Sequence, residues 1–222
     1  RFVAGESMAE FLPIARAANA QGFAVAATLL GESVRDRDET VSVTDQYCAL
    51  LNSFAEERLD ANVAFKLTHV GLDIDPELAF ENASRIAETA QQYGNAIRMD
   101  MEQSRYVDPT LSMYRRLRER YHNVGFVLQS YLYRSIGDLG AMLPLQPNVR
   151  IVKGAYLEPA SIAYPKKVDV DANYIRLAEM ALSGNGYTAI ATHDPKMIQW
   201  VARFAQDHGF PGCGRFEFQL LY

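Results

Sequence analysis

The sequence predicts an α/β protein of the (β/α)8 TIM-like barrel class, with seven strands present and the last strand and helix missing from the chain. Short apolar runs alternate with longer amphipathic segments, and successive runs begin about 25 to 40 residues apart, as expected for right-handed βαβ units. Most runs are continuously apolar, which is typical of parallel strands covered on both faces. At 222 residues, the chain is long enough for one large core of this kind.

The seven apolar runs are the expected strands. They cover residues 23–30, 63–67, 96–101, 124–128, 149–152, 187–191 and 216–222. Three helices are expected to begin where an aspartate precedes a proline, at Asp75–Pro76, Asp108–Pro109 and Asp194–Pro195. The aspartate side chain caps the first free amides, and proline suits the first helical position because its missing N–H had no partner there.

Other helices are expected from their caps and apolar stripes. A helix over residues 7–20 precedes the first strand and opens with a capping box from Ser7 to Glu10. Two later segments carry the stripe of a helix that lies on a sheet. These stripes are Tyr47, Leu50, Leu51 and Phe54 in one segment, and Ala79, Ala83, Ile86, Ala87 and Ala90 in the other.

We expect a single barrel domain over residues 1–222, C-terminally incomplete, because no linker or shift in composition divides the sequence. An open, doubly wound sheet is the competing architecture. Such sheets usually carry a glycine-rich turn after the first strand. Here that turn reads Leu30-Gly31-Glu32-Ser33 and lacks the GxGxxG pattern, which favours the barrel.

Composition argues against several classes of partner. A formal net charge of −5 predicts no nucleic-acid partner, since such proteins usually carry a clustered basic face. Cys48 and Cys213 lack CxxC spacing, which predicts free thiols in a reducing, cytoplasmic compartment. The four histidines show no metal-ligand spacing, so no metal site is expected. No apolar stretch approaches the roughly 18 residues that a membrane-spanning helix needs.

Polar side chains collect at the carboxyl ends of the expected strands. They are Glu32, Lys66, Asp100, Gln129, Arg150, Lys153, His193, Glu217 and Gln219. In a barrel these ends open on one mouth, where active sites are built. Because desolvating a charge is costly unless something compensates it, so many polar strand ends indicate a site for a zwitterionic or phosphate-bearing ligand.

A structural interpretation stays open for five of these residues. Lys66 and Asp100 could form a buried ion pair, and Arg150 could fill a layer of the barrel through a salt bridge. His193 could make only a local hydrogen bond, and Glu32 could be a carboxylate at the start of a helix.

At these same positions the sequence resembles the proline dehydrogenase family, of the monofunctional bacterial type, whose barrel also occurs in bifunctional proline utilisation A. One motif falls on each strand, in order, over nearly the whole chain. The motifs are Leu29–Glu32, Phe65–Thr68, Ile97–Glu102, Val127–Tyr131, Arg150–Tyr156, Ala191–Asp194 and Phe216–Gln219.

The resemblance implies that FAD binds at the carboxyl mouth and accepts a hydride from L-proline. The product is 1-pyrroline-5-carboxylate, this is the first step of proline catabolism, and the electrons pass to a membrane quinone. A peripheral contact with the inner face of the membrane is therefore expected, in addition to L-proline as substrate.

The resemblance also implies residue roles. Asp100 and Arg150 are the expected catalytic residues, with Arg150 beside the hydride-accepting flavin nitrogen. Lys66, Ala155 and Leu221 are expected to bind the substrate, and Glu32 to belong to a gate. The expected cofactor-binding residues are Met101, Gln129, Arg150, Val152, Lys153, Gly154, Ala155, Thr192 and His193.

One departure from the family pattern stands out. The family's eighth strand supplies a tyrosine and its eighth helix a pair of arginines for the substrate carboxylate, and this sequence contains neither. If those residues are absent, the sequence predicts weak proline affinity and an open barrel. Two other functions stay open beside proline oxidation: another flavin barrel, similar to methylenetetrahydrofolate reductase, and a catalytically silent barrel.

Overall fold

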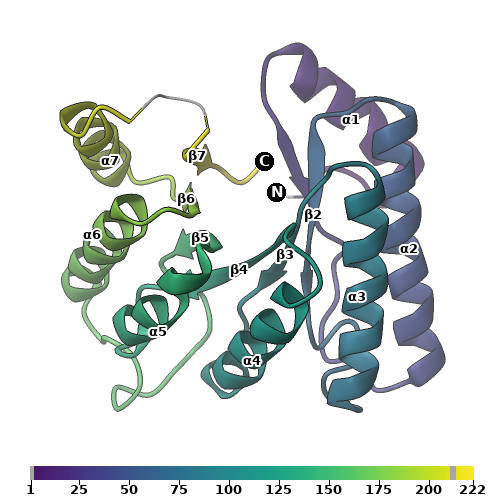
Figure 1. The fold of residues 1–222 in the computed structure, drawn as a ribbon, viewed down its shortest axis with the longest axis horizontal. Coiled ribbons are helices and arrows are strands. Elements are labelled where there is room, and N and C mark those ends of the chain that lie inside the picture. Colours follow the sequence, from purple (N-terminus) through teal and green to yellow (C-terminus); the bar gives the residue numbers. More distant parts are fainter. Residues whose placement is uncertain (1–2, 211–213) are drawn as a thin grey trace. The chain divides into compact units, whose positions relative to one another are not determined.

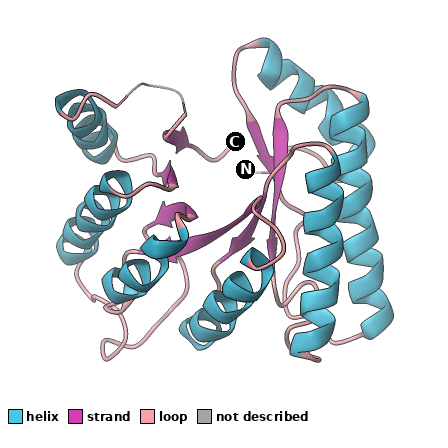
Figure 2. Cartoon of the chain, viewed as in Figure 1, coloured by secondary structure: helices cyan, strands magenta, loops and turns pink. Residues whose placement is uncertain are grey.

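The structure is a computed structural model that describes residues 3–210 and 214–222. The chain divides into two compact units. The N-terminal unit comprises residues 1–100, 110–124 and 222, and the C-terminal unit comprises residues 101–109 and 125–221. Helices and strands alternate in both (Figures 1 and 2). The single domain expected from the sequence stays a prediction. Cys213 lies outside the described residues.

The N-terminal unit is built on three parallel strands. Its elements are α1 (Met8–Ala20), β1 (Val25–Ala27), α2 (Arg37–Glu56), β2 (Ala61–Lys66), α3 (Pro76–Gln92), β3 (Ile97–Asp100) and the larger part of α4 (Val107–Arg118). Strand β2 lies between β1 and β3 and pairs with both in parallel. In this register Lys66 is the partner of Asp100, so these two strand ends are neighbours.

The C-terminal unit is built on four parallel strands. Its elements are η1 (Ser104–Tyr106), the first residues of α4, β4 (Val124–Gln129), α5 (Ser135–Met142), η2 (Leu143–Leu145), β5 (Asn148–Val152), α6 (Lys167–Ser183), β6 (Tyr187–Ala191), α7 (Pro195–Asp207) and β7 (Phe216–Gln219). The pairs β4–β5, β5–β6 and β6–β7 are all parallel. Their register places Val127, Arg150, Ala189 and Glu217 in one row across the strands.

The predicted fold class is confirmed in its seven parallel strands and their alternation with helices. Two strands end three residues earlier than expected, and the other strand bounds differ from the expectation by at most two residues. The first strand stops at Ala27, because the chain then leaves the sheet and Val34 N donates to Thr68 O in the loop after β2. The last strand stops at Gln219, and Leu221 N donates instead to the ring of His193.

Most of the predicted helix starts are confirmed. Asp75 and Asp194 cap α3 and α7 with a proline directly after them. Ser7 caps α1 by accepting from Glu10 N, but the return bond of the capping box runs from Glu6 N to Glu10 Oε2.

The prediction that Asp108 caps a helix is wrong. Helix α4 already begins at Val107, directly after the 3-10 turn η1, so Asp108 and Pro109 lie inside the first turn. The position still suits a proline, because first-turn amides need no partner within the helix. The Asp108 carboxylate pairs with Arg134 instead, and this partner lowers its pKa.

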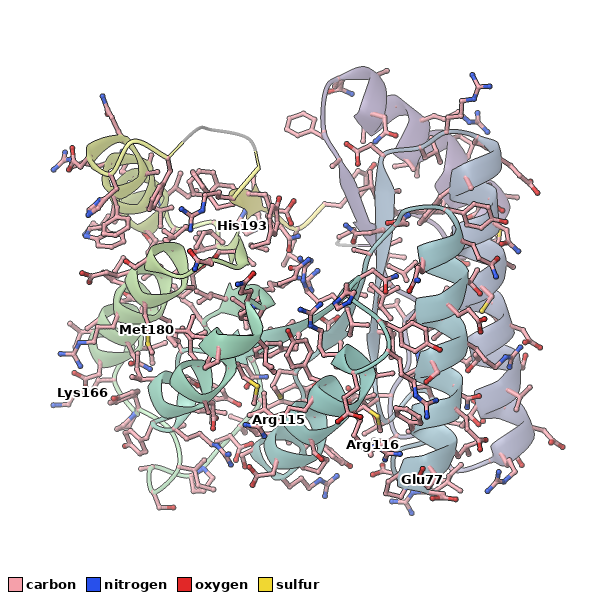
Figure 3. The ribbon with its side chains drawn as sticks, in the orientation of Figure 1. Glu77, Arg115, Arg116, Lys166, Met180 and His193 are labelled. Atoms are coloured by element: carbon pink, nitrogen blue, oxygen red, sulfur yellow. The ribbon has the colours of Figure 1, made fainter. Side chains whose placement is uncertain are left out.

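Apolar helix faces form the core, as the stripes predicted. Tyr47, Leu51 and Phe54 of α2 are fully buried, and the small residues of α3 allow that helix to pack closely. An exposed ion pair joins α3 to α4. Arg116 donates to both carboxylate oxygens of Glu77 at 2.9 and 2.8 Å, and both residues are labelled in Figure 3.

Asn173 gives a test of packing in the C-terminal unit. It is 2% exposed, and its Nδ2 donates to Ser130 O at 2.7 Å, which joins α6 to the end of β4. We expect Asn173→Ala to lower the free energy of unfolding by about 1–3 kcal/mol, because the buried Ser130 carbonyl loses its partner. Urea unfolding measures this. Glu179→Ala, at an exposed site of the same helix, is the control, with an expected change within about 0.5 kcal/mol.

Candidate functional site

In the N-terminal unit, two predicted site residues lie at adjoining strand ends, and a third, Glu32, pairs with one of them. Lys66 ends β2 and Asp100 ends β3 beside it. The Lys66 ammonium forms an ion pair with Glu32 Oε2 at 2.5 Å. The two side chains of this pair are 31% and 40% exposed, so solvent reaches both of them. Exposed ion pairs contribute little to stability.

The position of Glu32 is set by the loop that carries it. Ser33 N donates to Thr68 Oγ1 at 2.9 Å. Gly31 lies against the ring of His69, where an added Cβ would come within 2.4 Å of Nε2. Helix α2 begins at Arg37 with Asp36 as its cap, so the interpretation of Glu32 as a helix-start carboxylate is wrong.

His69 beneath this loop is 5% exposed. Its burial, and secondly the positive charge of Lys66, lower the pKa of its imidazole. The ring is therefore neutral at neutral pH and packs edge-on against Tyr47. A neutral ring here adds no second positive charge beside Lys66.

In the C-terminal unit, a chain of hydrogen bonds holds Arg150. Its Nε donates to Gln219 Oε1 at 2.6 Å, and Gln219 Nε2 donates to Glu217 Oε1 at 2.5 Å. Arg150 and Glu217 stand in one row of the strands, and Gln219 follows Glu217 on the same face of β7. The guanidinium is thus oriented by two residues of β7.

Gln129 connects the end of β4 to the segment after β3. It is 2% exposed, and its Nε2 donates to the carbonyls of Met101 at 2.9 Å and Glu102 at 3.1 Å. Its Oε1 has no hydrogen-bond partner among the described residues. Because a buried acceptor without a partner costs free energy, this oxygen is suited to accept from an N–H of a bound group.

The loop after β5 lies along the loop after β4. Ser130 N donates to Val152 O and Tyr131 N to Lys153 O, so the two chains continue side by side past the strands. Gly154 has a φ of +112°, and an added Cβ would come within 2.2 Å of the Tyr131 ring. Burial of the phenol raises the pKa of Tyr131 to about 12. Only glycine fits this turn.

Lys153 is held by two carboxylates. Its Nζ lies 2.7 Å from Asp171 Oδ1 in α6 and 3.0 Å from Asp194 Oδ2 at the start of α7. Burial alone would raise the pKa of Asp171, but hydrogen bonds from Lys153 and Lys167 lower it. The hydrogen bond from Lys153 is the main reason that the pKa of Asp194 is lowered as well. Both acids therefore stay ionised below the usual aspartate range.

Thr192 and His193 connect this cluster to the end of the chain. Thr192 is buried, and its Oγ1 accepts from Asp194 N at 3.1 Å. His193, which is labelled in Figure 3, accepts at Nε2 from Leu221 N at 2.9 Å, and this leaves the ring proton on Nδ1. The partner of His193 is 28 residues away in the sequence, so its hydrogen bond is not the local one considered from the sequence. Leu221 is 62% exposed, and Ala155 is exposed as well.

The structure thus brings the predicted site residues together in two groups. The N-terminal unit holds Glu32, Lys66 and Asp100, and the C-terminal unit holds Met101, Gln129, Arg150, Val152, Lys153, Gly154, Ala155, Thr192, His193 and Leu221. Each prediction of a role stays a prediction.

Sequence reasoning missed two connections. Asp171 has no motif that would single it out from the other acids at the start of α6. Glu158, in the loop after β5, accepts from the N–H and the hydroxyl of Ser104 at 2.6 and 2.8 Å.

No helix in the described part of the chain is both long and apolar enough to span a membrane.

Comparison with known proteins gives a consistent result. The family model described as "Proline dehydrogenase" matches residues 11–222. A proline dehydrogenase of Deinococcus radiodurans is 43% identical, and proline dehydrogenase 2 of Bacillus subtilis is 37% identical; each alignment covers all of this chain and 73% of the relative. The crystal structure of proline utilization A from Bdellovibrio bacteriovorus matches with a TM-score of 0.89 at 23% identity, over all of this chain and 28% of that one. This chain and the matched part of that protein therefore have the same fold.

Gly154→Ala tests the contact between the two loops. We expect it to lower the free energy of unfolding by about 1–3 kcal/mol, because the methyl group overlaps the Tyr131 ring and the backbone conformation is strained. Urea unfolding measures this. Gly137→Ala in α5 is the control, since an added Cβ there has no atom within 4 Å and alanine favours the helix. Equal effects of the two substitutions would contradict the proposed contact.

The Lys153 cluster predicts a pH dependence. Because the folded pKa of Asp171 is lowered, its contribution to stability is present above the unfolded pKa near 3.8 and is lost as pH falls through the folded value. We expect Asp171→Asn to flatten the fall in unfolding free energy below about pH 4. Thermal unfolding of both proteins from pH 6 to pH 2 checks this. Parallel curves would mean that Asp171 has the same pKa folded and unfolded.

Proposed function

The chain belongs to the proline dehydrogenase family, and we propose that it oxidises L-proline to 1-pyrroline-5-carboxylate with FAD as the hydride acceptor. Oxidation of proline is the first step of proline catabolism. The family match covers residues 11–222, which argues against a reductase of the methylenetetrahydrofolate type. The presence of Lys66, Asp100 and Arg150 argues against a silent barrel.

The buried Gln129 acceptor is the observation that best supports a flavin. Its Oε1 has no partner among the described residues, and an isoalloxazine ring carries an N–H that can donate to it. Gln129 also holds Met101, because its Nε2 donates to the Met101 carbonyl. Gly154 and Ala155 are exposed backbone that a cofactor can approach closely, and Val152 stands at the end of β5 below them. These residues fit the group, which when bound supplies a two-electron acceptor for the hydride.

Arg150 is the proposed electrostatic partner of that acceptor. Its guanidinium is oriented by Gln219 at 2.6 Å, so little reorganisation is needed when negative charge develops nearby. A guanidinium stays protonated throughout the physiological range, and it therefore stabilises that charge without giving up a proton.

Lys66 is the proposed anchor of the proline carboxylate. The Glu32 carboxylate already occupies this ammonium, which indicates that the position suits a carboxylate group. Asp100, at the adjoining strand end, would attract the cationic amine of proline and orient it. Glu32 is the proposed gate, because it must move when the substrate carboxylate takes its place. We assign Leu221 and Ala155 to the apolar side of the proline ring, since both are exposed.

Thr192 and His193 are proposed to contact the adenosine part of FAD rather than its phosphates. The Asp194 carboxylate already caps the start of α7 by accepting from Lys196 N at 3.1 Å. A phosphate at the same helix end would meet this negative charge. Uncharged hydroxyl groups would not be repelled, and His193 Nδ1–H is a suitable donor to them.

We propose a membrane quinone as the second electron acceptor, in keeping with the family, with a cytoplasmic location and peripheral membrane contact.

Anaerobic reduction by L-proline tests the proposed function. The purified protein should be yellow, and its absorbance near 450 nm should fall when L-proline is added without oxygen. Bleaching by NADH but not by proline would favour a reductase of the folate type instead. A colourless protein that takes up no FAD would contradict flavin chemistry altogether.

Arg150→Met should lower the reduction potential of the flavin and slow its reduction by proline by about 10²-fold, because a fixed positive charge is lost where negative charge develops. Stopped-flow absorbance measures the limiting rate, and a dye-linked titration measures the potential. An unchanged rate and potential would rule out the role assigned to Arg150.

Lys66→Met should raise the dissociation constant for proline by about tenfold or more and change the limiting rate less, because it removes a binding contact. Glu77→Gln is the matched control, since it removes a different exposed ion pair of the same unit. A loss of limiting rate at unchanged affinity would place Lys66 in the chemical step.

A further inference from the structure

We infer that Asp171 and Asp194 are positioning residues for the Lys153 ammonium in the FAD site, an inference that rests on the proposed function. Lys153 stands directly after β5, Asp171 lies in the first part of α6, and Asp194 caps α7. All three belong to the C-terminal unit. Three separate elements therefore meet at a single ammonium group.

The geometry fixes the direction of this ammonium. A lysine ammonium has three N–H donors on a flexible stem of four carbons. Nζ donates to Asp194 Oδ2 at 3.0 Å and forms an ion pair with Asp171 Oδ1 at 2.7 Å. Three donors exceed what the hydrogen bond to Asp194 needs, so the ammonium can also donate to a bound group. Because the stem is already ordered, binding through this donor costs less conformational entropy than binding to a free lysine.

The cluster is also partly shielded from water. The side chains of Lys153, Asp171 and Asp194 are 26%, 28% and 22% exposed. Lys167, which is 71% exposed, pairs with Asp171 at 2.5 Å and lies 3.7 Å from Asp194. Two cations and two anions thus balance, so the acids orient Lys153 without leaving an excess of negative charge beside a phosphate-bearing cofactor.

Asp194 gives this cluster a direct connection to the rest of the proposed cofactor site. One carboxylate oxygen accepts from Lys196 N and the other from Lys153, while its own N–H donates to Thr192 Oγ1. The position of Lys153 is therefore coupled to that of Thr192 through one residue. Asp171 supplies the second fixed point from α6.

A double-mutant cycle on FAD release tests the inference. The holoenzyme is diluted, and the rise in fluorescence of released FAD gives the dissociation rate. We expect Asp171→Asn to accelerate release by about 5- to 20-fold when Lys153 is present, and by less than about twofold in a Lys153→Met background, because the aspartate acts through the lysine. Asp194→Asn should behave in the same way, since asparagine keeps the helix cap and removes only the charge.

Controls separate positioning from a general loss of structure. Asp169→Asn removes an acid from the first turn of the same helix α6 and should leave FAD release unchanged. Asp171→Glu restores the carboxylate and should recover most of the slow release. Lys153→Gln serves as a second background that keeps a polar side chain.

Each other outcome overturns the inference. Equal acceleration in both backgrounds would mean that Asp171 acts independently of Lys153, and no acceleration would mean that it has no role. Slower release would mean that the carboxylates repel the cofactor. A wild-type protein that binds no FAD and oxidises no proline would instead refute the proposed function, which keeps the two failures distinct.

Discussion

Parallel pairing of strands that are consecutive in the chain is the constraint on which both units depend. Because of this pairing, the carboxyl ends of all strands in a unit lie at the same edge. Residues that are far apart in the sequence therefore become neighbours there. Lys66 and Asp100 adjoin for this reason. Arg150 reaches Gln219 for the same reason, because β5, β6 and β7 follow one another in register.

Pairing of opposite charges within each unit offsets the free energy of desolvating charged side chains at these edges. Lys66 is held by Glu32, and Lys153 by two aspartates. The two arrangements differ in how easily they can be opened. The side chains of the Lys66–Glu32 pair are 31% and 40% exposed, which suits exchange with a substrate carboxylate. The Lys153 cluster draws on three elements, which suits a permanent support for a cofactor.

Much of the fold follows from local signals in the sequence. Continuously apolar runs mark strands covered on both faces, and Asp-Pro pairs mark helix starts, as Asp75 and Asp194 show. The exception at Asp108 has a physical cause. A short 3-10 turn starts the helix earlier, and the sequence does not reveal such a turn because its own hydrogen bonds are local and weakly dependent on residue type.

By itself, the sequence determined the fold class, the family and the set of polar residues at the strand ends, since periodicity, capping and ordered motifs are properties of the chain alone. Only the tertiary structure decided which partner each polar residue has. Three contacts join positions that are between 18 and 69 residues apart in the sequence. They are the ion pair of Asp171 with Lys153 and the hydrogen bonds between Gln219 and Arg150 and between His193 and Leu221. Such pairings depend on strand register and helix docking, which arise from packing of the whole unit and leave no local pattern in the sequence.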